Sequence, residues 1–102
     1  MNHNSFSDND NTTVLRVEGE LDALSSAELR PTVDELTRGE GRKIRVDLSE
    51  LNLLDSSGAG CLVALYTRAR ANGGSVTFVG VVDQPLAIFK LLRLDRVFDL
   101  AA

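Results

Sequence analysis

A seven-residue stretch in the middle of the chain, LDSSGAG at residues 54–60, combines one carboxylate, two hydroxyls and two glycines. Asp and Ser side chains accept hydrogen bonds from free N–H groups in the first turn of a helix, so this stretch could cap a helix that follows it. A cap needs only one such residue, and a glycine in the first turn weakens a helix by roughly 0.5–1 kcal/mol relative to alanine. The stretch is therefore either a plain helix start or a site on which another molecule acts.

Several catalytic chemistries lack their necessary parts. Serine hydrolysis needs a histidine base, and the only histidine, His3, lies in a polar N-terminal stretch. Residues 58–60 match neither a phosphate-binding loop ending in Lys-Ser/Thr nor a G-x-G-x-x-G turn. Asp22 and Asp55 alone are too few ligands for a metal. We therefore predict a protein that is not an enzyme and has no cofactor and no metal site.

Composition bounds the class of protein. The 102 residues, 43% of them hydrophobic, are enough for one domain with one packed core. Eleven Lys and Arg against 15 Asp and Glu give a net charge of −4, which argues against nucleic acid as a partner. The single cysteine excludes an internal disulfide. Because the sequence shows no signal peptide and no apolar run of roughly 18 residues, we expect a cytoplasmic protein with no membrane partner. We also expect a monomer.

Hydrophobic periodicity predicts strands that alternate with helices. Alternating or β-branched apolar residues predict three strands, at 14–18, 43–48 and 75–82. Helical spacing and helix-start residues predict three helices, at 25–38, at 57–71 and from residue 83 or 84 onward. Ser25 and Glu28 have the spacing of a capping box. We expect a loop at 49–54, a short extended segment at 93–100 and a polar, flexible tail, or at best a ragged edge strand, at 1–11.

The same periodicity predicts which side chains form the core. The expected core residues are Ile44, Val46 and Leu48 on one strand, Cys61, Leu62, Leu65, Tyr66 and Ala69 on one helix face, and Leu91, Leu92 and Leu94 near the end. On such a stripe a cysteine is expected to act as a small buried hydrophobe rather than as a redox thiol.

The predicted order implies an α/β sheet with crossover helices, in a domain that spans residues 12–102. In such sheets ligands gather where strands end and helices begin. The GELD turn at 19–22 follows one predicted strand, and the LDSSGAG stretch follows another strand and its loop. Both lie before a predicted helix, so the two are expected on one edge of the sheet.

Three separated motifs resemble the STAS-domain anti-sigma factor antagonists of bacterial partner-switching systems. They are GELD at 19–22, DLSELNLLDSSGAG at 47–60 and LLRLDRVF at 91–98. The resemblance implies a STAS-like fold with a central mixed sheet of four to five strands and about four helices. It also implies binding to an anti-sigma factor that is an ATP-dependent serine kinase, with a serine phosphatase that reverses the modification.

The resemblance further implies that Ser56 is the phosphoacceptor, with Ser57 as the alternative. In the implied mechanism the unphosphorylated chain sequesters the kinase. The implied partner-binding residues are Asp22, Asp55, Ser56, Ser57, Gly58, Ala59 and Gly60. Ala59 stands where the family usually has a bulky apolar residue, which bears on partner choice. Two alternatives stay open: Asp22 could simply start a helix, and the domain could be a scaffold or a transporter-associated subunit whose serines only cap a helix.

Overall fold

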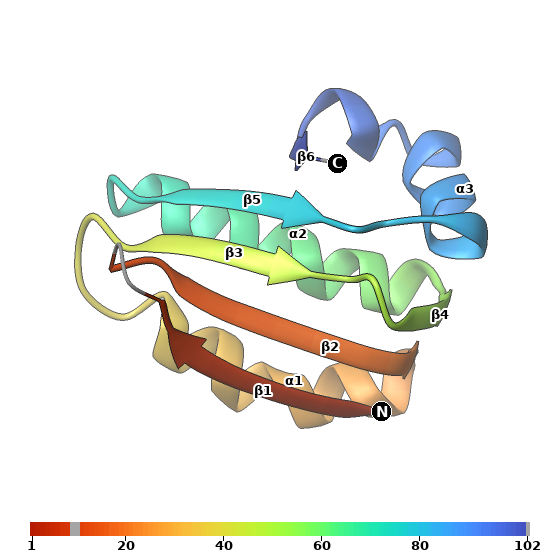
Figure 1. Ribbon diagram of the computed structural model, residues 1–102, viewed down its shortest axis with the longest axis horizontal. Coiled ribbons are helices and arrows are strands. Elements are labelled where there is room, and N and C mark those ends of the chain that lie inside the picture. The colour runs from red at the N-terminus through yellow and green to blue at the C-terminus, as the bar shows by residue number, and fades with distance from the viewer. Residues whose placement is uncertain (9–10, 102) are drawn as a thin grey trace.

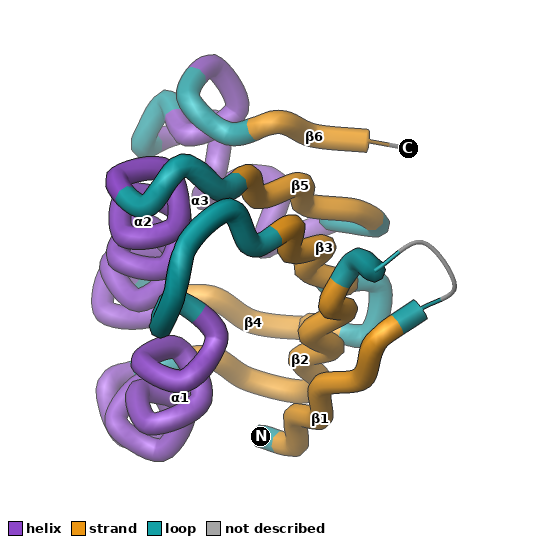
Figure 2. The backbone as a smooth tube through the Cα atoms, turned by 90° about the vertical axis from the view of Figure 1, so that its left-hand side faces the viewer, coloured by secondary structure: helices purple, strands orange, loops and turns teal. Residues whose placement is uncertain are grey.

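In the residues that this computed structural model describes, 1–8 and 11–101, six strands form one sheet with helices packed against one face (Figures 1 and 2). The elements in chain order are β1 (Asn2–Ser7), β2 (Thr13–Leu21), α1 (Ala23–Leu36), β3 (Lys43–Asp47), β4 (Leu51–Leu54), α2 (Ser56–Ala71), β5 (Ser75–Val79), α3 (Asp83–Leu91), the 3₁₀ helix η1 (Leu94–Arg96) and β6 (Asp99–Ala101). The strand order is β1-β2-β3-β5-β6, and β4 also pairs with β2. Strand β1 is antiparallel to β2 and the other pairings are parallel, so the predicted mixed α/β fold is confirmed.

The core lies between the sheet and the helices, where the sequence pattern placed it. Ile44, Val46 and Leu48 are all buried, as their alternation predicts. The predicted stripe of α2 is buried too, apart from the half-buried Tyr66. The opposite face of the sheet carries the ion pairs Arg16–Asp47, at 3.3 Å, and Arg45–Asp8, at 3.0 Å.

Aromatic packing attaches the C-terminal segment to the sheet. Phe98 stacks on Phe78 of β5 with ring centroids 4.2 Å apart, and Phe89 of α3 meets Phe98 edge to face at 5.5 Å. The prediction that Leu91 and Leu92 are core residues is wrong, because they are 75% and 44% exposed. Phe89 faces the core, so Leu91 points to the opposite side of α3, and Leu92 already lies beyond the helix end.

The N-terminal segment, predicted as a flexible tail or at best a ragged edge strand, forms the edge strand β1. Its register with β2 runs from Asn2 opposite Glu18 to Ser7 opposite Thr13. A side-chain hydrogen bond between His3 and Thr32, at 2.9 Å, also connects it to α1. The sequence did not decide between tail and strand because the segment is polar and mostly exposed, so backbone pairing holds it without any apolar alternation. Residues 9 and 10 of the predicted tail lie outside the described residues.

Two other boundaries differ from the prediction. The expected loop at 49–54 contains β4, whose ends Leu51 and Leu54 are buried while the two residues between them are exposed, a pattern without alternation. Helix α1 begins at Ala23 rather than Ser25, because the preceding aspartate caps it. The expected extended segment at 93–100 is divided between η1 and β6.

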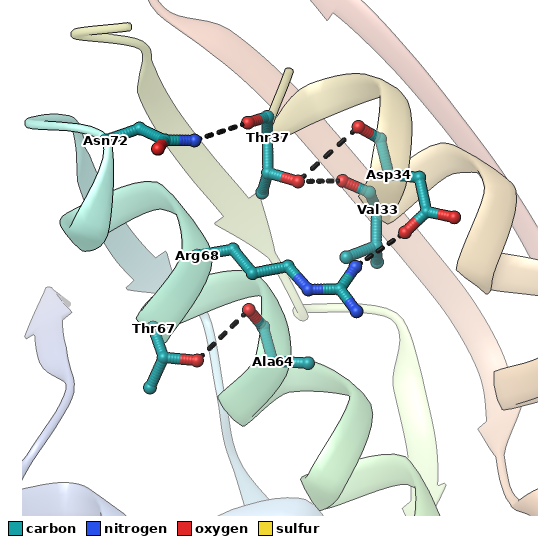
Figure 3. Close-up of polar contacts among 7 residues, drawn as sticks. All are labelled: Val33, Asp34, Thr37, Ala64, Thr67, Arg68 and Asn72. Atoms are coloured by element: carbon teal, nitrogen blue, oxygen red, sulfur yellow. Dashed lines mark hydrogen bonds and ion pairs between the residues drawn. The ribbon is translucent and has the colours of Figure 1, made fainter. Parts of the chain in front are cut away.

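Polar contacts join the C-terminal ends of α1 and α2 (Figure 3). The guanidinium of Arg68 on α2 forms an ion pair with Asp34 on α1. The Asn72 side chain donates a hydrogen bond of 2.8 Å to the carbonyl of Thr37, just beyond α1. The two helices are therefore fixed to each other at the end remote from the LDSSGAG stretch.

Candidate functional site

Two strand-to-helix turns lie side by side at one edge of the sheet. Strands β2 and β4 are parallel neighbours with Leu21 paired to Leu54, and each is followed directly by an aspartate. Asp22 accepts a 3.0 Å hydrogen bond from the backbone N–H of Ser25 and caps α1. Asp55 accepts a 2.8 Å hydrogen bond from the N–H of Gly58 and caps α2. The expectation that both turns share one edge is confirmed.

The residues that cap the two helices differ from those predicted. At α1 the capping box joins Asp22 and Ser25, because the Ser25 hydroxyl accepts a 2.8 Å hydrogen bond from the Asp22 N–H. At α2 the cap is Asp55, and in the described part of the chain neither Ser56 nor Ser57 uses its hydroxyl in a hydrogen bond. Two hydroxyls at the start of α2 are therefore unnecessary for capping it.

Close packing explains why residue 58, one of the two glycines in the stretch, is a glycine. A Cβ atom at this position would lie 2.3 Å from the carbonyl oxygen of Leu21 and 2.8 Å from a methyl carbon of Leu54. The Asp55 N–H donates a 3.2 Å hydrogen bond to the same Leu21 oxygen. Glycine is thus required because the start of α2 presses against the turn that precedes α1.

The residues predicted to contact a partner differ in how exposed they are. Asp55, Ser56, Ser57 and Gly60 are exposed and Asp22 is half-buried. Gly58 and Ala59 are both buried, Ala59 with only 2% of its surface exposed, so in this structure they pack inside the domain, and their contact with a partner stays a prediction. Gly60 is different, because a Cβ there would meet nothing within 4 Å.

A glutamine that sequence reasoning missed holds β4 in place. The Gln84 side chain of α3 accepts a 2.8 Å hydrogen bond from the Leu54 N–H and donates one of 2.9 Å to the Leu54 carbonyl. It thereby pairs both backbone groups of the residue just before the Asp55 cap. No local pattern identifies such a residue, because its partner lies 30 positions away.

The space between the two turns is an open depression of about 260 Å³ with an acidic and apolar lining. It is lined by Glu20, Leu21, Asp22, Leu53, Leu54, Asp55 and Gln84. Leu53 is 49% exposed in it, and the neighbouring Leu24 is 75% exposed. These two side chains add exposed apolar surface to the acidic rim of the depression. We call Asp22, Leu24, Leu53, Asp55 and Ser56 the docking edge.

Among the described residues no group of three or more His, Cys, Asp or Glu could hold a metal ion. None of the helices in the described ranges is long and apolar enough to cross a membrane. Near the edge, burial raises the pKa of the Cys61 thiol, although the charges of Arg30 and Arg68 oppose this. That thiol thus stays protonated and packs as a small apolar group.

The two glycines of α2 should respond differently to alanine. We expect Gly58→Ala to destabilise the domain by roughly 1–3 kcal/mol, because the new methyl group meets backbone that must shift. Gly60→Ala is the matched control: its methyl group enters open space, so stability should stay the same or rise by roughly 0.4–1 kcal/mol. Urea denaturation of both variants measures this, and equal losses would contradict the close approach.

Asp22 should make stability depend on pH. The backbone N–H and the hydroxyl of Ser25 hydrogen-bond its carboxylate and lower its pKa. Its contribution is therefore complete above the unfolded-state pKa of about 3.9 and is lost as the pH falls through the lower folded-state value. In thermal melts at a series of pH values, we expect Asp22→Asn, which keeps a capping oxygen, to lose less stability at neutral pH than Asp22→Ala. Matching curves for wild type and Asp22→Ala would contradict this cap.

Comparison with known proteins places this chain in a family. The family model described as "Mlab, STAS domain" matches residues 4–101. An anti-sigma-B factor antagonist from Bacillus subtilis (strain 168) is 26% identical over 94 residues, or 92% of this chain and 85% of that protein.

Two solved structures share the fold. An anti-sigma factor antagonist from Mycobacterium paratuberculosis matches with a TM-score of 0.82 at 24% identity, over 97% of this chain and 85% of that one. The Bacillus cell fate determinant SpoIIAA in its phosphorylated form matches with a TM-score of 0.73 at 19% identity, over 99% and 92%. Because the family model spans nearly all of the sequence, the chain belongs to the STAS domain family.

Proposed function

We propose that this protein is an anti-sigma factor antagonist, a binding module that sequesters an anti-sigma factor through the docking edge. The observation that carries the proposal is the pair of exposed serines at the start of α2, whose hydroxyls the cap does not use. The name of the Bacillus subtilis relative supports it. The acidic and apolar lining of the depression fits a partner surface that offers basic and apolar groups.

Ser56 is the proposed phosphoacceptor, and the anti-sigma factor is the proposed ATP-dependent serine kinase. Ser56 is the first residue of α2 and is exposed. Ser57 is also exposed, but it lines a groove between α1 and α2, and Ser56 is not among the residues that line this groove. The chain itself supplies only the acceptor hydroxyl; the kinase supplies catalysis, and a serine phosphatase restores the hydroxyl.

The negative charge of the phosphate is the proposed reason why phosphorylation of Ser56 weakens partner binding. A phosphoserine adds about −1.5 to −2 charges at pH 7. At Ser56 these charges would join Glu20, Asp22 and Asp55, which already line the depression. Within the free domain the N-terminus of α2 stabilises the phosphate by typically 0.3–1 kcal/mol. Formation of the complex removes water from the phosphate, so the penalty falls on binding. The phosphorylated form of SpoIIAA shows that a protein of this fold exists in such a state.

The alternative is a scaffold or transporter-associated subunit in which the serines serve only the helix start. The structure disfavours it on one observation, namely that Asp55 makes the capping hydrogen bond to Gly58. Serines that neither cap nor pack need another role, and acceptance of a phosphate provides one.

The acceptor is tested by incubating the protein with ATP and its cognate anti-sigma factor. We expect intact-mass spectrometry to show one added phosphate on the wild type and on Ser57→Ala, and none on Ser56→Ala, because only the Ser56 hydroxyl is the acceptor. Peptide mapping locates the group. Phosphate on Ser57 with Ser56 untouched would overturn the assignment, and the absence of phosphate on every form would favour the scaffold.

The effect of charge is tested with Ser56→Asp and Ser56→Ala. We expect Ser56→Asp to lose affinity for the anti-sigma factor in calorimetric titration while its melting temperature stays close to that of the wild type, because the added charge disturbs the complex and not the fold. Ser56→Ala should keep both affinity and stability. If Ser56→Asp melts far lower and loses binding in proportion, unfolding rather than surface charge is the switch.

A further inference from the structure

The side of β4 that faces away from β2 has no strand beside it. In residues 1–8 and 11–101, β4 pairs with β2 alone, and α3 packs against β4 at the same end of the molecule (Figure 1). Backbone groups of successive residues in a strand face opposite edges. The Asp55 N–H bonds to the Leu21 carbonyl at the end of β2, so the N–H and C=O of Leu54 face α3 instead.

The Gln84 carboxamide of α3 takes the place of a neighbouring strand for Leu54. It accepts the 2.8 Å hydrogen bond from the Leu54 N–H and donates the 2.9 Å bond to the Leu54 carbonyl. Leu54 is only 2% exposed, so water does not readily replace either bond, and unpaired backbone groups are costly when they are buried. Among side chains, only those of Gln and Asn offer the donor and acceptor of an amide, as a peptide group does.

The residue that Gln84 holds lies two positions before Ser56. Leu54 is followed directly by Asp55, whose carboxylate caps α2. In the described part of the chain the Ser56 hydroxyl makes no hydrogen bond of its own, so its position depends on this backbone. The segment from Leu54 to Ser56 is therefore held from two sides, by the Leu21 carbonyl and by Gln84.

We propose that Gln84 is a positioning residue for the phosphoacceptor. Its carboxamide holds Leu54, and through Leu54 the Asp55 cap and the Ser56 hydroxyl, in the arrangement that the anti-sigma factor binds and phosphorylates. The inference rests on the proposed function of the docking edge and adds a residue that controls this edge from α3. Gln84 acts through the Leu54 backbone rather than on the reacting atoms. In the reaction the Ser56 oxygen bonds to the γ-phosphorus of ATP, ADP leaves, and the hydroxyl proton passes to the kinase.

Loss of the two hydrogen bonds to Leu54 should allow the acceptor segment to adopt several arrangements. Only a fraction of the molecules would then present Ser56 correctly, and the apparent affinity for the kinase falls by that fraction. Once bound, Ser56 occupies the same place as in the wild type, so the chemical step keeps its rate. A positioning role thus raises KM and leaves kcat unchanged, whereas a loss of the fold lowers the melting temperature of the whole domain.

The test compares Gln84→Met, which removes both hydrogen bonds at nearly constant side-chain length, with Lys90→Met. Lys90 is exposed on the same helix, and within the described ranges no hydrogen bond or ion pair involves its side chain. The cognate anti-sigma factor is the kinase, at a temperature where melts show the wild type and both variants folded. We expect Gln84→Met to raise KM for Ser56 phosphorylation by roughly tenfold at unchanged kcat. Lys90→Met should match the wild type.

Amide hydrogen exchange of Leu54, followed by NMR in the free protein, supplies a measurement that does not need the kinase. We expect the Leu54 amide to exchange roughly tenfold faster or more in Gln84→Met than in Lys90→Met, because its hydrogen-bond acceptor is gone. The Val46 amide, on a strand paired on both sides, should change less.

The outcomes separate this inference from the proposed function. If the wild type takes up no phosphate, the proposed function fails and the inference fails with it. If the wild type is phosphorylated but Gln84→Met has the KM of Lys90→Met, only the role of Gln84 is overturned. The same holds if kcat falls while KM stays unchanged, if Leu54 exchanges no faster in Gln84→Met, or if KM rises only in proportion to an unfolded fraction seen in the melts.

Discussion

The close contact between the start of α2 and the carbonyl of Leu21 is the constraint on which the site depends. The Leu21 carbonyl oxygen accepts a hydrogen bond from the Asp55 N–H. A Cβ atom at residue 58 would lie only 2.3 Å from the same oxygen. The contact brings two aspartate-capped helix starts to one sheet edge, and the Gln84 side chain fixes the adjoining end of β4. The position of Ser56 is therefore set by the backbone packing of three separate chain segments.

The sequence predicted those strands and helices in which the spacing of apolar residues matches the spacing of buried positions. The alternation of Ile44 and Val46 and the stripe around Leu65 are buried as predicted, because each side chain faces one common core. Strand β1 was left undecided between a tail and an edge strand, because an exposed edge strand needs backbone pairing but no apolar side chains. Strand β4 was missed because four residues between two turns are too few to show a period.

The candidate site was predictable in position but only partly in detail. Residues 54–60 were singled out because their hydroxyls and glycines exceed what a helix cap needs, and the structure assigns the cap to Asp55 and a packing role to Gly58. That Gly58 and Ala59 face inward could not be read from the sequence, since it depends on the contact with Leu21. Gln84 was missed for the same reason: its partner is distant along the chain.

The polar character of β1 also bears on how readily a second chain could pair with this edge of the sheet. An edge strand presents unpaired backbone groups, and a second chain could add to it as a further strand. The sequence NHNSFS offers such a neighbour little apolar surface beyond one phenylalanine, so an added strand would gain backbone hydrogen bonds but few buried contacts. The polar, exposed surface of β1 thus makes addition of a further strand at this edge less favourable.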